Sequence, residues 1–271
     1  MRRCLYGLAV AALFFVTGPA AGASNFGRPV LDVPFVTTPD EVVTAMLKLA
    51  AVRPDDVIYD LGSGDGRIVI AAVHDFGVRH GVGVDLDPHR VTEARAAAAK
   101  AGVADRARFV QGDVFKFDFS PASVVTMYLS PRINRELLPR LLAELKQGTR
   151  IVSHSFLLGD WEPDDTVKVE EGHEIYRWVV PAQFGGSWQW TVGAGRYTVA
   201  LRQSFQKIGG TLHLGDRAAP ITDGVVTGDR LQFSAKLGDK PVRFDGRLDG
   251  GSITATLGGA VTARIVATHA P

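Results

Sequence analysis

The sequence predicts an α/β domain followed by a smaller all-β domain. Between residues 34 and 181, short apolar runs alternate with amphipathic helical stretches, which is typical of βαβ units around a parallel sheet. From residue 185 onward, apolar side chains alternate with period two, and turn signals recur roughly every 8–12 residues. This second pattern fits either a small barrel or a sandwich. We therefore expect domains at 24–183 and 184–271.

The elements of the α/β domain follow in order from residue 39. A helix is expected at 39–49, with Thr38 as N-cap, Pro39 in its first position and Glu41 as the capping partner. Further helices are expected at 66–76, 89–101 and 134–147. Strands are expected at 57–60, 106–110, 123–129, 149–156, 166–169 and 175–180, and another should end at Asp85.

Composition narrows the class of protein. The chain has 271 residues, of which 46% are hydrophobic and 22% charged, as in ordinary soluble globular proteins. Its formal net charge of +1 gives no reason to expect a nucleic-acid surface. The seven histidines are scattered and the only cysteine is Cys4, so no metal-ligand spacing is present. Nothing in the sequence sets the oligomeric state.

Residues 1–23 have the layout of a secretory signal peptide. Arg2 and Arg3 precede an apolar run at 4–16, and Ala21-Gly22-Ala23 places cleavage before Ser24. The run is about 13 residues long, whereas a membrane span needs about 20, so no stable span is expected after cleavage. A retained anchor or a misassigned start codon is the alternative. We expect an exported or periplasmic protein, or a cytoplasmic one if the leader is misjudged.

The stretch at 57–70, VIYDLGSGDGRIVI, predicts a ligand-binding turn between a buried strand and a helix. Gly62, Gly64 and Gly66 stand at alternate positions, where backbone without a Cβ lets a ligand approach closely. A dinucleotide-binding fold wants G-x-G-x-x-G instead, which argues against an NAD-dependent oxidoreductase. Asp85 and Asp113 follow later strands, so they should meet the loop at the carboxyl edge of a parallel sheet.

The run Asp60-x-Gly62-x-Gly64-x-Gly66, taken with Asp85, resembles the class I (seven-strand) S-adenosylmethionine-dependent methyltransferases over about residues 34–181. That resemblance implies a Rossmann-like seven-strand sheet and S-adenosylmethionine as the cofactor. It implies that 60–66 hold the methionine part, Asp85 the ribose hydroxyls and Asp113 the adenine amino group. The expected cofactor-binding residues are Thr38, Asp60, Gly62, Ser63, Gly64, Asp65, Gly66, Asp85, Leu86, Asp113 and Val114.

Four fragments carry a narrower resemblance: PFVTTP at 34–39, DLGSGDGRIVIAA at 60–72, YLSP at 128–131 and RIVSHSFLLGDWEPD at 150–164. They are similar to the mitochondrial lysine methyltransferases of the ATP synthase c subunit and the adenine nucleotide translocase, and to bacterial relatives. That family usually has P-x-x-P-T-P at the first fragment. The resemblance implies a protein lysine as acceptor. The fourth-strand motif is not N-P-P-Y, which lowers the odds of nucleic-acid N-methylation.

The acceptor side of the site is less sharply defined. Tyr128 is expected to form the wall of the acceptor channel and to offer its ring face to an ammonium group, although a core tyrosine fits equally well. His154 is a candidate proton relay or a structural histidine. Ser130, Pro131 and Trp161 are expected to line the acceptor region, with Trp161 as a cap. No general base is assigned.

The expected leader conflicts with the expected cofactor, because S-adenosylmethionine is made in the cytosol. The alternative is an exported, non-catalytic binding protein that keeps a methyltransferase fold and uses the β domain for docking. The intact glycine loop and Asp85 argue against such a relict, because a relict has no physical need for them. The β domain carries no recognisable chemistry, so it grips a substrate, anchors the enzyme to an envelope partner or only stabilises it.

Overall fold

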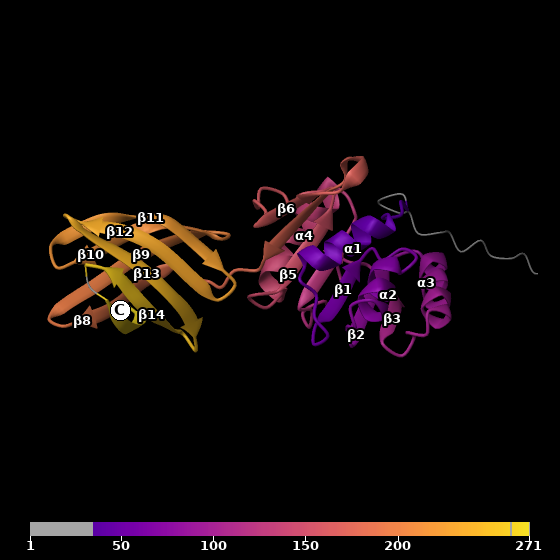
Figure 1. Ribbon diagram of the computed structural model, residues 1–271, viewed down its shortest axis with the longest axis horizontal. Coiled ribbons are helices and arrows are strands. Elements are labelled where there is room, and N and C mark those ends of the chain that lie inside the picture. The colour runs from indigo at the N-terminus through magenta and orange to yellow at the C-terminus, as the bar shows by residue number, and fades with distance from the viewer. Residues whose placement is uncertain (1–34, 261, 271) are drawn as a thin grey trace, which may run out of the picture. The chain divides into compact units, whose positions relative to one another are not determined.

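A computed structural model describes residues 35–260 and 262–270, and their strands form a seven-stranded sheet and a closed barrel (Figure 1). The expected fold class is confirmed, and the second part is a barrel rather than a sandwich. The expected leader at 1–23 lies outside the described residues. Within the described part of the chain, no helix is long and apolar enough to cross a membrane.

The sheet has the strand order β3-β2-β1-β4-β5-β7-β6. Its strands are β1 (Val57–Leu61), β2 (His80–Asp85), β3 (Ala107–Gln111), β4 (Val124–Met127), β5 (Arg150–His154), β6 (Asp165–Lys168) and β7 (Glu174–Val179). The first five run parallel, and β7 is antiparallel to both of its neighbours. In β1, Leu61 pairs with Val84 on one side and Met127 on the other, so the three strands end together.

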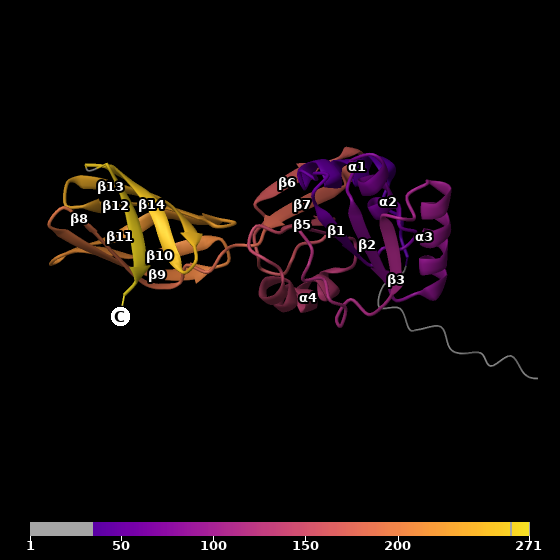
Figure 2. The ribbon, with the colours of Figure 1, turned by 90° about the horizontal axis from the view of Figure 1, so that it is seen from below.

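Helices cover both faces of this sheet (Figure 2). The helices α1 (Asp40–Leu49), α2 (Arg67–His74) and α3 (Pro88–Lys100) pack their apolar stripes into one core. The helix α4 (Pro131–Glu144) packs on the opposite face through side chains such as Leu137 and Leu141. A short 3₁₀ turn, η1 (Glu170–Gly172), precedes β7. Two buried faces explain why the central strands are continuous apolar runs.

The first helix begins differently from the expectation. Pro39 is the N-cap residue and no side chain caps the helix, so the predicted capping box of Thr38 and Glu41 is wrong. Thr38 Oγ1 lies instead 3.3 Å from His154 Nδ1 at the end of β5, which is a tertiary contact that local sequence rules do not anticipate. The helix α4 also begins three residues earlier than expected, with Ser130 as its N-cap.

The barrel is an antiparallel meander that closes between its first and last strands. Its strands are β8 (Gly186–Val192), β9 (Gly195–Ser204), β10 (Lys207–Leu214), β11 (Arg217–Thr227), β12 (Arg230–Leu237), β13 (Lys240–Asp249), β14 (Ser252–Gly259) and β15 (Ala263–His269). Closure comes from the pairing of β15 with β8, where His269 faces Trp188. Aromatic rings fill the interior, with Phe233 and Phe244 stacked at 4.7 Å between centroids.

Gly66 provides a direct test of the packing between α2 and its neighbours. It has a φ of +82°, and a Cβ there would lie 2.6 Å from Phe109 Cε1 and 2.9 Å from Ala94 Cβ. Gly66→Ala should therefore destabilise the fold by about 2–4 kcal/mol, since left-handed strain and overpacking add. Gly102→Ala is the matched control, with a φ of +69° and no atom within 4 Å of its Cβ. Equal losses in urea unfolding would contradict the packing argument.

Candidate active site

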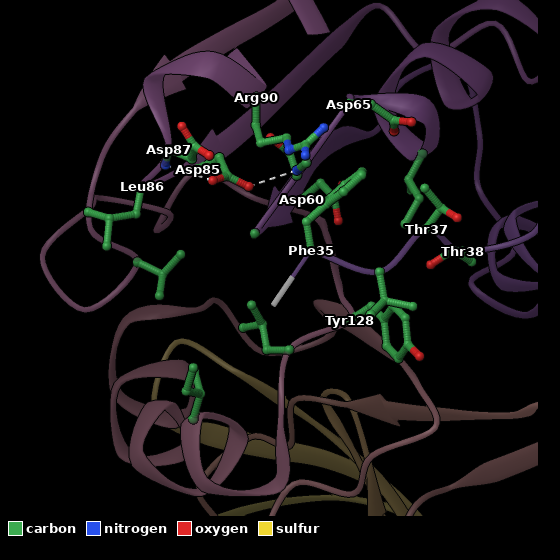
Figure 3. Close-up of a pocket in the computed structure, with 18 of the residues that line it drawn as sticks. Phe35, Thr37, Thr38, Asp60, Asp65, Asp85, Leu86, Asp87, Arg90 and Tyr128 are labelled. Carbon is green, nitrogen blue, oxygen red and sulfur yellow. Dashed lines mark hydrogen bonds between the residues drawn. The ribbon is translucent and has the colours of Figure 1, made fainter. Parts of the chain in front are cut away.

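A pocket lies at the carboxyl ends of β1, β2 and β4, as expected for an open parallel sheet. Figure 3 shows Asp85, Leu86 and Asp87 toward one side of it and Thr38 and Tyr128 toward the other. Its lining residues are Phe35, Val36, Thr37, Thr38, Asp60, Gly62, Ser63, Gly64, Asp65, Arg67, Ile68, Asp85, Leu86, Asp87, Arg90, Gly112, Asp113, Val114, Phe115, Tyr128, Leu129 and Ile133. Residues far apart in the sequence thus share one cavity.

The glycine loop is held against the end of β2 by backbone hydrogen bonds. The amides of Gly62 and Ser63 both donate to Val84 O, at 2.8 and 2.9 Å. Gly62 and Gly64 have φ angles of +80° and +52°, which glycine adopts without strain. A Cβ on Gly64 would lie 2.4 Å from the Phe35 ring, and one on Gly62 would lie 2.4 Å from Leu129 Cδ2. Only glycine therefore allows Phe35 and Leu129 to pack this closely against the loop.

Asp85 joins the loop to the pocket. Its Oδ2 accepts a hydrogen bond from the Gly64 amide at 2.8 Å, and its Oδ1 accepts from the Asp87 amide at 2.9 Å. A carboxylate has about four acceptor positions, so two remain for a ligand that donates hydroxyl protons. Asp113 stands farther along the same edge and accepts from the Phe115 amide at 2.9 Å. Both carboxylates are therefore preorganised by backbone donors.

Asp60 is a buried carboxyl group at the base of the pocket, with 2% of its surface exposed. Thr126 Oγ1 donates a hydrogen bond to its Oδ1 at 2.7 Å. Burial raises the pKa of Asp60 to about 7, and the charges of Asp85 and Asp65 add to the increase. A cationic group bound nearby would favour the ionised form of this carboxyl.

The residues present fit S-adenosylmethionine. Ser63 Oγ is buried beside the glycine loop without a hydrogen-bond partner among the described residues, which leaves a polar atom for a ligand. Asp85 and Asp113 offer acceptors to hydroxyl and amino donors, while Asp60 suits a cationic ligand. Gly62 and Gly64 line the pocket with backbone and place no side chain in it. No group of three or more metal-binding side chains occurs in the described ranges.

One of the expected cofactor residues lies outside the pocket lining, and another lines it while paired with an arginine. Gly66 is absent from the pocket lining, because its Cα faces Phe109 and Ala94 under the loop. Asp65 lines the pocket, but Arg67 Nη2 donates to its Oδ2 at 2.6 Å. Arg67 Nη1 also donates to Thr38 O at 2.8 Å, so this pair ties the segment at 35–38 to the loop.

The segment at 35–38 was not expected to line the pocket beyond Thr38. Phe35 lies over Gly64, and the Arg90 guanidinium lies 3.8 Å from the centroid of its ring. The remaining lining residues outside the expectation are Val36, Thr37, Arg67, Ile68, Asp87, Gly112, Phe115, Leu129 and Ile133. Arg67, Asp87, Gly112, Phe115 and Leu129 are sequence neighbours of expected residues. Phe35 has no local signal, because its contacts are tertiary.

The side of the pocket where the acceptor is expected is aromatic. Tyr128 lines it, and the ring of His154 packs behind Tyr128 with centroids 4.0 Å apart. Phe156 stacks on the same tyrosine at 5.9 Å. His154 itself is fully buried and does not line the pocket. Burial, with a smaller contribution from His173, lowers the pKa of His154 to about 4, so its imidazole is neutral at pH 7.

Three residues expected to contact the acceptor lie elsewhere. Trp161 is 1% exposed and packs in the core, where its backbone oxygen accepts a hydrogen bond from Trp178 Nε1 at 2.8 Å. Ser130 caps α4 by accepting from the Ile133 amide at 3.3 Å, and Pro131 begins that helix. None of the three lines the pocket, because Ser130 and Pro131 form the start of α4 and Trp161 fills a core position.

The raised pKa of Asp60 predicts a pH-dependent stability difference. Between pH 4 and 7 the unfolded chain loses the Asp60 proton while the folded chain keeps it, so its contribution to stability falls as pH rises. Asp60→Asn should gain stability relative to the wild type over this window, by up to about 4 kcal/mol at pH 8. Urea unfolding at pH 4.5, 6 and 8 measures this. Asp105→Asn, at an exposed carboxyl, is the control, and a pH-independent difference for Asp60→Asn would contradict the assignment.

Comparisons with known proteins agree with this geometry. The family model described as the ANTKMT methyltransferase domain matches residues 60–165. A protein-lysine N-methyltransferase of Saccharolobus islandicus (strain REY15A) is 48% identical over 151 residues, which cover 55% of this chain and 94% of the relative. The adenine nucleotide translocase lysine N-methyltransferase of Mus musculus is 38% identical over 133 residues, which cover 49% of this chain and 57% of that protein.

A solved structure with a similar sequence contains an S-adenosyl ligand. It is the crystal structure of an RNA methyltransferase from Salinibacter ruber in complex with S-adenosyl-L-homocysteine, at 51% identity and a TM-score of 0.53. The match covers 55% of this chain and 96% of that one. The glycine loop, its acids and these relatives lead to one conclusion. The chain belongs to the ANTKMT-type methyltransferase family and is a class I S-adenosylmethionine-dependent methyltransferase.

Proposed function

We propose that this methyltransferase N-methylates a lysine side chain of a protein. The observation that carries the proposal is the 48% identity to a protein-lysine N-methyltransferase, 94% of which is matched. The aromatic acceptor side of the pocket supports it, because Tyr128 offers a ring face to an ammonium group or its alkyl stem. Leu129 and Ile133 supply apolar walls beside it.

The chemistry asks the pocket to remove a proton and to position the amine. A lysine amine has a solution pKa of about 10.4 and has no free lone pair until it is deprotonated. An apolar, partly closed channel lowers that pKa by desolvating the ammonium form. S-adenosylmethionine, when bound, supplies an electrophilic methyl group. The protein's part is then to hold the amine in line with that group, which accounts for a large share of such rate enhancements.

The cofactor is assigned to the expected acids and the loop. Asp85 would offer its two free acceptor positions to the ribose hydroxyls, and Asp113 would accept from the adenine amino group, with Leu86 and Val114 beside the ring. The loop residues Gly62, Ser63 and Gly64, together with Asp60, would hold the methionine part. Thr38 and Asp65 complete this end, the latter through its ion pair with Arg67.

RNA is the competing acceptor, since the relative from Salinibacter ruber is described as an RNA methyltransferase. Two features favour protein. The formal net charge of +1 provides little electrostatic attraction for a polyanion. The fourth strand also leads into Tyr128-Leu129-Ser130-Pro131, which is not the N-P-P-Y motif associated with nucleic-acid N-methylation. In this chain, Ser130 caps α4 and Pro131 begins it.

Asp85→Ala tests the cofactor assignment. The substitution removes the acceptor of the Gly64 amide and the positions assigned to the ribose, so affinity for S-adenosylmethionine should fall by at least about tenfold. Calorimetry on the full chain measures the dissociation constant. Asp105→Ala, whose carboxylate is 76% exposed, is the matched control and should bind as the wild type does. Unchanged affinity in Asp85→Ala would remove Asp85 from the cofactor site.

The acceptor is tested with methyl-tritiated S-adenosylmethionine, poly-L-lysine and a bacterial extract. Label should enter poly-L-lysine and the protein of the extract, and it should be lost after protease but kept after ribonuclease. Acid hydrolysates should contain methylated lysine, and Asp85→Ala should give at least about tenfold less, in line with its weakened cofactor binding. Label found only in RNA, or only in another amino acid, would overturn the lysine proposal.

A further inference from the structure

We propose that Thr38, His154 and His173 form a proton relay that carries the acceptor's proton from the pocket to solvent. The inference rests on the proposed function, because it concerns how a protonated amine becomes a nucleophile in that pocket. His154 and His173 are outside the pocket lining, so they act as positioning and proton-transfer residues behind the wall rather than as contacts to the amine.

The three side chains make a continuous path. Thr38 lines the pocket, and its Oγ1 lies 3.3 Å from His154 Nδ1. On the other side of the same ring, His154 Nε2 lies 2.9 Å from His173 Nδ1. His154 is fully buried, while His173 is half-buried, so the path starts in the cavity and ends at the protein surface. Figure 3 places Thr38 on the same side of the pocket as Tyr128, the proposed acceptor wall.

The path crosses parts of the chain that are distant in sequence. Thr38 precedes α1, His154 ends β5 and His173 follows η1. Arg67 holds Thr38 in place by donating to its backbone oxygen at 2.8 Å. Tyr128 holds the His154 ring from the pocket side, with 4.0 Å between centroids. Both ring nitrogens of His154 are therefore held within hydrogen-bonding distance of their partners.

Burial, with a smaller contribution from His173, keeps His154 neutral and so available for proton transfer. The titratable groups that face it are Tyr128 and His173, and Glu174 follows His173 in the chain. The Glu174 carboxylate is engaged by Lys168 at 3.0 Å and by the Tyr176 hydroxyl, so it does not hold the His154 ring as a cation. The lowered pKa of His154 leaves one ring nitrogen free to accept and the other protonated.

The relay balances as three linked transfers. We assign the His154 proton to Nε2, which then donates to His173 Nδ1, while Nδ1 accepts from the Thr38 hydroxyl. The substrate ammonium gives a proton to Thr38 Oγ1 as the Thr38 proton passes to His154 Nδ1. The His154 Nε2 proton passes to His173, whose imidazolium releases a proton to water. The amine keeps its electron pair. After the product leaves, solvent protonates His173, and the reverse transfers through His154 and Thr38 pass one proton to water in the open pocket. This restores the starting tautomer, and over the full cycle one proton goes from the acceptor to bulk water.

An experiment that needs no acceptor tests the tautomers. Nitrogen NMR of the histidine-labelled full chain at pH 7 should show His154 protonated at Nε2 and unprotonated at Nδ1. It should also show a coupling through the hydrogen bond to His173 Nδ1. His173→Gln should remove that coupling, while the rest of the spectrum should remain that of a folded protein. A His154 proton on Nδ1, or a cationic His154, would overturn the relay whatever the acceptor proves to be.

Kinetics with poly-L-lysine test the transfer itself. His154→Gln keeps a hydrogen-bond acceptor and donor but cannot pass a proton, so kcat at pH 7 should fall by about 10²-fold at unchanged cofactor affinity. The solvent deuterium isotope effect on kcat should rise in this variant. The isosteric Thr38→Val should lose about as much kcat as His154→Gln, and Thr38→Ser, which keeps the hydroxyl, should recover most of the kcat that Thr38→Val loses.

Rescue separates a relay from a purely structural histidine. In His154→Gly, added imidazole should restore activity in proportion to its concentration, whereas pyrrole, which fills the space without a basic nitrogen, should not. Equal rescue by both, or wild-type rates in His154→Gln, would overturn the proposal. If the wild type methylates no lysine, the proposed function fails and the relay fails with it. Lysine methylation together with a His154 proton on Nδ1 would overturn the relay alone.

Discussion

The hydrogen bond from the Gly64 amide to Asp85 is the contact on which the site depends. It joins the loop after β1 to the end of β2 at 2.8 Å, and the Gly62 and Ser63 amides strengthen the same junction through Val84 O. Because two acceptor positions of Asp85 are occupied by backbone, the remaining two are presented in a fixed direction. The same hydrogen bonds therefore fix both the shape of the loop and the direction of the Asp85 carboxylate.

Two buried titratable groups divide the site into ends of different chemistry. Asp60 sits below the glycine loop with a raised pKa, in a place that suits a cation. His154 sits behind Tyr128 with a lowered pKa and remains neutral. Burial drives both shifts, and in each case it opposes the charged form. A carboxyl group whose ionised form a cation would favour thus lies on one side of the site, and a neutral histidine lies behind its aromatic wall.

Several features of the site follow from local sequence and were predicted. The spacing of Gly62 and Gly64, and acids at strand ends, indicated the edge of the sheet and part of the pocket lining. Other features depend on tertiary packing and helix capping. Ser130 caps α4 and Trp161 packs in the core, so neither lines the pocket. Thr38 resembles a helix cap in sequence, but its hydroxyl meets His154, which lies 116 positions away.

The sequence by itself determined the class of fold and the cofactor loop, because periodicity, glycine spacing and strand-end acids are local properties of the chain. Only the tertiary structure decided that the second part closes into a barrel, since closure depends on the pairing of β15 with β8 across the whole module. Tertiary structure also placed Phe35 over the loop and set His154 between Thr38 and His173. Such contacts join residues whose separation along the chain carries no local signal.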